Sequence, residues 1–135
     1  MSKQMKETSY GFSKVVPMGY DEAIKHVTEE MKKEGFGVLT QADVAATLKN
    51  RIGVDFKPYT ILGACNPEHA YHALQMEAEI GLLLPCNFIV YVNDDNETVV
   101  SAVNPMASMQ ALYNPDLGET AATVQRKIKN IIQNL

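Results

Sequence analysis

The chain has 135 residues, 46% of them hydrophobic and 21% charged, and it carries a net charge of −4 at pH 7. This length and composition are typical of one folded domain and exclude a disordered or fibrous chain. The negative charge disfavours nucleic acid and anionic membranes as partners, because both are recognised through a basic face. We therefore expect a single domain over residues 1–135, with residues 1–5 as a flexible N-terminal extension.

The first residues are polar and lack the apolar centre of a secretory signal, which favours a cytoplasmic protein. The longest apolar run, residues 80–86, contains Gly81 and Pro85 and is far too short to cross a bilayer. In a cytoplasmic protein we expect the two cysteines, Cys65 and Cys86, to be free thiols rather than a disulfide.

The first half of the chain alternates strands and helices. Residues 8–16 alternate apolar and polar side chains and predict a strand. Apolar residues at helical spacing predict a helix over residues 20–34, and residues 36–40 form a second strand candidate. Asp43 is placed to cap a second helix, which ends at Gly53.

The next segment begins with an apolar, β-branched strand over residues 59–64. Asn66 follows as a helix cap with Pro67 at the first helical position, where a missing N–H costs nothing, and this helix is expected to run toward Glu79. Two further strand patterns flank a turn rich in Asn and Asp and predict a hairpin, over residues 88–92 and 98–103.

The clearest helical signal lies at the C-terminus, where apolar residues recur at intervals of four and three between Leu117 and Leu135. A hairpin requires antiparallel pairing, so the strands cannot form a purely parallel sheet. We therefore expect an α+β fold, in which helices pack on one face of a mixed or antiparallel sheet.

Two Cys-Asn elements are the features most able to carry chemistry. The sequence contains no phosphate-binding loop, dinucleotide fingerprint, nucleophile elbow or C-x-x-C motif, which removes most support for nucleotide-dependent and serine-hydrolase functions. One element follows the strand over 59–64 and the other precedes the strand over 88–92; they are Cys65-Asn66-Pro67 and Pro85-Cys86-Asn87.

These elements allow a functional and a structural interpretation. Cys65 would lie just before a helix N-terminus, where free N–H groups favour the thiolate. Gly63 would let a ligand approach the end of the strand closely, and Asn87 would offer hydrogen bonds beside Cys86. In the structural interpretation both cysteines are small buried hydrophobic residues, and Asn66 is only a helix cap.

Strand direction decides whether the two thiols can act together. If the strands that flank them are antiparallel, Cys65 and Cys86 lie at the same end of the sheet. If the strands are parallel, a strand of six residues separates the thiols by roughly 20 Å. We prefer the antiparallel arrangement.

Two further groups of residues suggest weaker alternatives. Cys65, His69, His72 and Cys86 would supply four metal ligands, although their spacing matches no established zinc pattern. Arg51, Lys57 and Tyr59 would present a cationic and aromatic rim to a small anion, or form part of a solvated loop. We expect no cofactor.

Two segments carry a resemblance to a known family: VDFKPYTILGACNP at residues 54–67 and EIGLLLPCN at residues 79–87. In these segments and in the order of its elements, the sequence from residue 6 to residue 135 resembles the bacterial and archaeal family known as domain of unknown function 302 (DUF302). The positions that match the family signature are Gly63, Cys65, Asn66, Pro67, Leu84, Pro85, Cys86 and Asn87.

The resemblance implies an α+β fold of the TATA-binding-protein-like type, with a curved, mostly antiparallel sheet of about five strands covered by helices. It also implies a small cytoplasmic protein that forms a homodimer, and it implies no reaction. The likeness to the TATA-binding protein concerns sheet architecture alone.

Three functional hypotheses follow. In the first, the protein is a binding or accessory module that holds a small polar ligand near the two Cys-Asn elements. In the second, it is a thiol-dependent enzyme or redox protein, with Cys65 as the reactive thiolate and Cys86 as its resolving partner. In the third, it is a structural or dimerisation domain without a ligand.

Overall fold

The structure is a computed structural model that describes residues 4–110 and 114–135. Six strands form one antiparallel sheet in the order β1-β2-β6-β5-β4-β3. The strands are β1 (Lys6–Glu7), β2 (Gly11–Val16), β3 (Gly37–Asp43), β4 (Tyr59–Cys65), β5 (Cys86–Val92) and β6 (Thr98–Val103).

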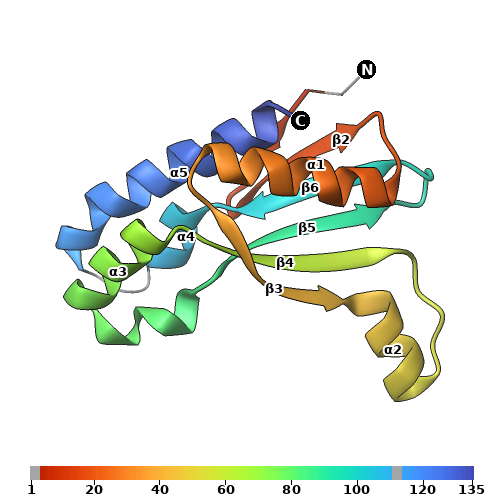
Figure 1. Cartoon of the computed structure of the whole chain (residues 1–135), viewed down its shortest axis with the longest axis horizontal. Helices are drawn as coiled ribbons and strands as arrows, with labels where there is room; N and C mark the ends of the chain where they lie inside the picture. The colour runs from red at the N-terminus through yellow and green to blue at the C-terminus, as the bar shows by residue number, and fades with distance from the viewer. Residues whose placement is uncertain (1–3, 111–113) are drawn as a thin grey trace.

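Helices cover one face of this curved sheet and gather at one of its ends. Helices α1 and α5 lie across the sheet, whereas α3 and α4 sit beyond the end at which β4 stops and β5 starts (Figure 1). The expected α+β fold with an antiparallel sheet is therefore confirmed. The helices are α1 (Tyr20–Lys33), α2 (Val44–Ile52), α3 (Pro67–Met76), α4 (Pro105–Met109) and α5 (Gly118–Gln133), with short 3₁₀ helices η1 (Ala78–Leu83) and η3 (Pro115–Leu117).

The core lies between the sheet and helices α1 and α5. Alternate residues of the central strands point toward the helices, including Phe88 and Val90 of β5 and Val100 of β6, and all three are fully buried. Helix α5 contributes Ile128 and Ile131 to the same cluster. Each such side chain stabilises the fold by about 1.5–3 kcal/mol through removal from water.

The predicted N-terminal caps of α2 and α3 and the predicted end of α2 agree with the structure because they rest on local chemistry. The carboxylate of Asp43 accepts a hydrogen bond from the Ala46 amide at 2.9 Å, and α2 ends at Gly53, whose φ of 69° is left-handed. Asn66 caps α3, with Pro67 at its first position. The hairpin of β5 and β6 is also present.

Some predicted boundaries are wrong. The strand predicted over residues 8–16 is β2, which begins at Gly11 because the Thr8 side chain and backbone form a turn with Gly11. The third helix does not continue to Glu79: it ends at Met76, because Glu77 is extended with a φ of −146°, and η1 follows.

Strand β3 is longer than predicted, because its pairing with β4 continues to Asp43 beyond an irregularity between Val38 and Thr40. The extension predicted for residues 1–5 lies partly outside the described residues. Within the described part, Met5 packs against the core. In the described ranges 4–110 and 114–135, no helix has the length and apolar character needed to span a bilayer.

Candidate functional site

The antiparallel pairing of β4 and β5 brings the two Cys-Asn elements to one end of the sheet. Ala64 is the register partner of Cys86, so Cys65 ends one strand where Cys86 begins the next. This is the arrangement that the two thiols need in order to share a site. Strand alternation places the side chain of Cys86 on the helix-covered face, with Phe88 two residues along.

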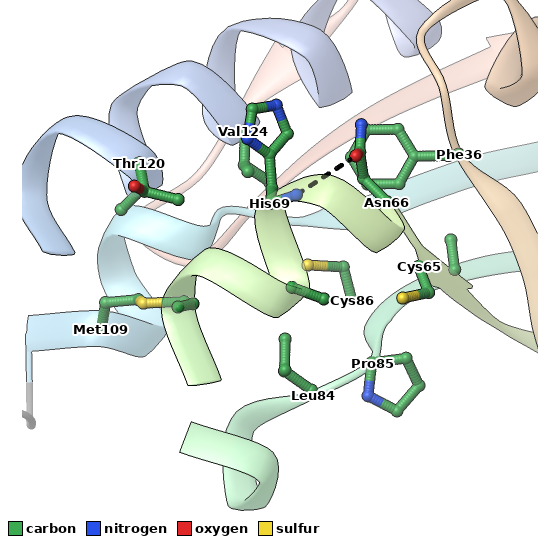
Figure 2. Close-up of a pocket in the computed structure, with 14 residues that line it drawn as sticks. Phe36, Cys65, Asn66, His69, Leu84, Pro85, Cys86, Met109, Thr120 and Val124 are labelled. Carbon is green, nitrogen blue, oxygen red and sulfur yellow. Dashed lines mark hydrogen bonds between the residues drawn. The ribbon is translucent and has the colours of Figure 1, made fainter. Parts of the chain in front are cut away.

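Both cysteines line one cavity at this end of the sheet. Its walls come from the ends of β4 and β5 and from helices α3, α4 and α5 (Figure 2). The space open to the centre of a water-sized sphere is about 40 Å³. The lining is mostly apolar and consists of Phe36, Ala64, Cys65, Asn66, His69, Ala70, Ala73, Leu84, Pro85, Cys86, Met109, Thr120, Ala121 and Val124.

Asn66 joins two elements at the rim of the cavity. Its side-chain oxygen accepts a hydrogen bond from the His69 amide at 3.4 Å, which caps α3. Its side-chain nitrogen donates to the Glu34 carbonyl at 3.2 Å, just beyond the end of α1. Because Asn66 is buried and both ends of its amide are engaged, its first role is to fix α3 against α1.

Gly63 has a packing role two residues before Cys65. A Cβ atom at this position would lie 2.1 Å from Thr40 Oγ1 and 2.6 Å from Pro85 Cγ. Both distances are far below van der Waals contact, so only glycine lets Thr40 of β3 and the Pro85 ring pack against β4. The close approach expected at Gly63 therefore comes from the chain itself.

The electrostatics of the cavity favour neutral groups. Burial, with a smaller contribution from Cys65, raises the pKa of the Cys86 thiol to about 11, so this thiol is uncharged at neutral pH. Burial and the neighbouring Lys127 ammonium lower the pKa of His69. Lys127 Nζ lies 3.0 Å from His69 Nε2, which accepts its hydrogen bond.

Other residues of the Cys-Asn elements lie outside the cavity. Asn87 is exposed on the opposite face of the sheet, where its register partner is Gly63. Pro67 is exposed at the start of α3 and does not line the cavity. Of the two Cys-Asn elements, the residues that line this cavity are therefore Cys65, Asn66, Pro85 and Cys86.

The cationic and aromatic residues of the predicted anion rim lie elsewhere. Tyr59 starts β4, so the length of this strand, roughly 20 Å, separates it from Cys65. The Tyr59 ring stacks on Tyr91 with centroids 5.3 Å apart, and Lys57 lies 5.7 Å from the Tyr91 ring centre. Arg51 is exposed on α2. These three residues do not share a site with the cysteines.

The metal alternative finds no support in the geometry. Within residues 4–110 and 114–135, no three side chains of His, Cys, Asp or Glu are grouped so that they could hold a metal ion. His72 is exposed on α3 and does not line the cavity. His69 does line it, but its Nε2 is engaged by a lysine whose charge would oppose a bound cation.

Sequence reasoning missed most of the cavity wall. Ala70 and Ala73 of α3 line it because small side chains leave space there, and Met109, Ala121 and Val124 close it from α4 and α5. The sequence signal for this wall was the apolar periodicity of α3 and α5. It predicted that each helix has a buried face but did not indicate a cavity beside that face.

The two hydrogen bonds of Asn66 lead to a stability prediction. Asn66→Ala removes the helix cap and leaves the Glu34 carbonyl without this donor, so we expect the free energy of unfolding to fall by about 1–3 kcal/mol. Asn66→Asp keeps the acceptor for the His69 amide but sets a carboxylate oxygen against the Glu34 carbonyl oxygen, so it should also destabilise the fold. Urea unfolding measures both, and an alanine variant as stable as the wild type would contradict the assigned role.

The raised pKa of Cys86 leads to a reactivity prediction. In a Cys65→Ser variant, Cys86 is the only thiol, and at pH 8 only about one molecule in a thousand carries the thiolate. The rate of alkylation by iodoacetamide should keep rising with pH toward pH 11 without levelling earlier. The same variant unfolded in urea is the control, with a midpoint near about 8.5. A midpoint near that value in the folded protein would refute the burial argument.

Comparison with known proteins adds a family to this geometry. A family profile described as "Domain of unknown function DUF302" matches residues 12–135. The chain also superposes, with a TM-score of 0.86 and 31% sequence identity, on a structure described as "Crystal structure of uncharacterized conserved protein DUF302 from Bacillus stearothermophilus", over 93% of this chain and 97% of that chain. The search of curated proteins returns no match. Because the profile spans nearly the whole chain and both Cys-Asn elements, the chain belongs to the DUF302 family.

Proposed function

We propose that this DUF302 protein is a binding module that holds a small apolar molecule, or the apolar end of a larger one, in the cavity between the sheet end and α3. The observation that carries this proposal is the cavity itself, which both cysteines line. Cys65, His69, Leu84 and Met109 are half-buried rather than fully buried, so the cavity reaches the surface, where a ligand can enter.

The composition of the wall supports an apolar ligand rather than the polar one expected from the Cys-Asn elements. A volume of about 40 Å³ has room for a few water molecules, but a water needs two to four polar partners to be stable there. The polar atoms of the Asn66 side chain are already used within the protein. An alkyl or thioether group would lose nothing by leaving water for this space.

The thiol-enzyme alternative has less support. A resolving cysteine must form a thiolate, and the raised pKa of Cys86 keeps it protonated at neutral pH. The ring nitrogen of His69 nearest to Lys127 already accepts a hydrogen bond, which removes it as a base for either thiol.

Titration with 1-hexanol tests the binding proposal: the space of about 40 Å³ is too small for the whole molecule, so its alkyl end is expected to enter while its hydroxyl group stays outside. With ¹³C-labelled methionine methyl groups, we expect the Met109 signal to shift saturably, because Met109 lines the cavity. Met106 on the same helix does not line it and should respond little, and glycerol should cause no saturable shift.

A pair of matched variants separates cavity binding from surface binding. Ala70→Leu fills the cavity and should weaken hexanol binding by about tenfold or more. Ala122→Leu makes the same change on the exposed side of α5 and should bind as the wild type does. If the Met109 signal does not shift, or if Ala70→Leu binds hexanol as the wild type does, the cavity is not a binding site. That result would favour the third hypothesis, a structural domain without a ligand.

A further inference from the structure

One part of the chain has almost no contact with the core. We use "the arm" for residues 37–58, which comprise β3, α2 and the loop to β4. All seven residues of β3 are exposed, α2 has no buried residue, and no residue of the loop is buried. Figure 1 shows α2 hanging beyond the corner of the sheet, away from α1 and α5. The arm is therefore held to the body mainly by the pairing of β3 with β4.

The arm presents apolar side chains to solvent. Leu39 and Ile52 are each 66% exposed, and Val54 and Phe56 are also exposed. Helix α2 is amphipathic, with Val44, Leu48 and Ile52 at helical spacing. Val44 and Leu48 are half-buried beside β3 and β4, whereas Ile52 is exposed, and none of the three is fully buried. A helix of nine residues is marginal in water and depends on packing for its stability.

The accessible surface area of the chain is larger than expected for a folded monomer of its mass. The accessible surface is 7979 Å², whereas a folded monomer of 14.9 kDa is expected to expose roughly 7,000 Å². The excess of roughly 1,000 Å² is close to the ~800 Å² that each partner buries in a standard interface between two chains. This excess belongs to the chain as a whole, and the exposed strand, helix and loop of the arm contribute to it.

The edge of the sheet adds a reason for strand pairing. β3 is the last strand of the sheet, so its outer backbone groups face no other strand among the described residues. Edge strands are usually protected by prolines or several charges, but β3 has the sequence GVLTQAD, with a single charge at its end and one irregularity beside Leu39. Such an edge is complementary to an identical strand that runs antiparallel to it.

We propose that the arm is the homodimer interface of this protein, covered by a second copy of the same chain. Three features favour a second copy as the partner: the excess area of the whole chain is close to one side of a two-chain interface, the β3 edge is complementary to itself, and the arm carries both signs of charge. Its cations are Lys49, Arg51 and Lys57 and its anions Asp43 and Asp55, so two arms meet without strong like-charge repulsion. An acidic or basic partner would need an excess of one sign.

Sedimentation velocity across the micromolar range tests the interface. The wild-type chain should sediment as a dimer, and Leu39→Glu and Ile52→Glu should each raise the dissociation constant about tenfold or more, because each places a charge in the buried centre. Leu82→Glu is the matched control: this leucine is 84% exposed but lies in η1, outside the arm, and its variant should remain dimeric. Circular dichroism verifies that each variant is folded.

Hydrogen–deuterium exchange of the wild-type chain gives a second readout that needs no variant. Amides of β3 and α2 should exchange more slowly at high protein concentration than at low, while those of η1 should not change. A wild-type chain that stays monomeric overturns the proposal. Arm variants that dimerise as the wild type does, or a Leu82→Glu variant that dissociates as they do, also overturn it.

Discussion

The close approach at Gly63 is the constraint on which this end of the molecule depends. β3 on one side and the segment entering β5 on the other both use the space that a side chain at Gly63 would fill, through Thr40 and Pro85. Pro85 in turn sets where Cys86 enters the sheet, opposite Ala64. The packing of Thr40 and Pro85 against β4, beside the two cysteines, therefore depends on the missing Cβ of Gly63.

The chemistry of the cavity follows from this packing. Because the ends of β4 and β5 lie close together, Cys86 is buried and its thiol stays protonated at neutral pH. Both ends of the Asn66 side-chain amide form hydrogen bonds that hold α3 to α1. The residues that resemble a reactive site thus serve mainly to build a wall. The feature on which the proposed function rests is the space that they enclose, which small side chains such as Ala70 leave open.

Features set by neighbours in the sequence were predictable, and features set by packing were not. The caps at Asp43 and Asn66 and the end of α2 at Gly53 follow from local hydrogen bonding and backbone freedom, and the alternation of β5 and β6 predicted their hairpin. The cavity wall forms because α4 and α5 pack near the end of β4, and the spacing of residues within a short segment does not encode this long-range packing. Lys57 and Tyr59 are close to Cys65 in sequence, but the strand between them carries the cysteine to the far end of the sheet.

The most direct test of this account compares the free energy of unfolding of two Gly→Ala variants in urea. Gly63→Ala forces a Cβ into Pro85 and Thr40 and should lose about 1–3 kcal/mol of stability. Gly37→Ala, at a position with no atom within 4 Å of the new Cβ, should be neutral or gain up to about 1 kcal/mol. A Gly63→Ala variant as stable as the wild type would contradict the central role of this close approach.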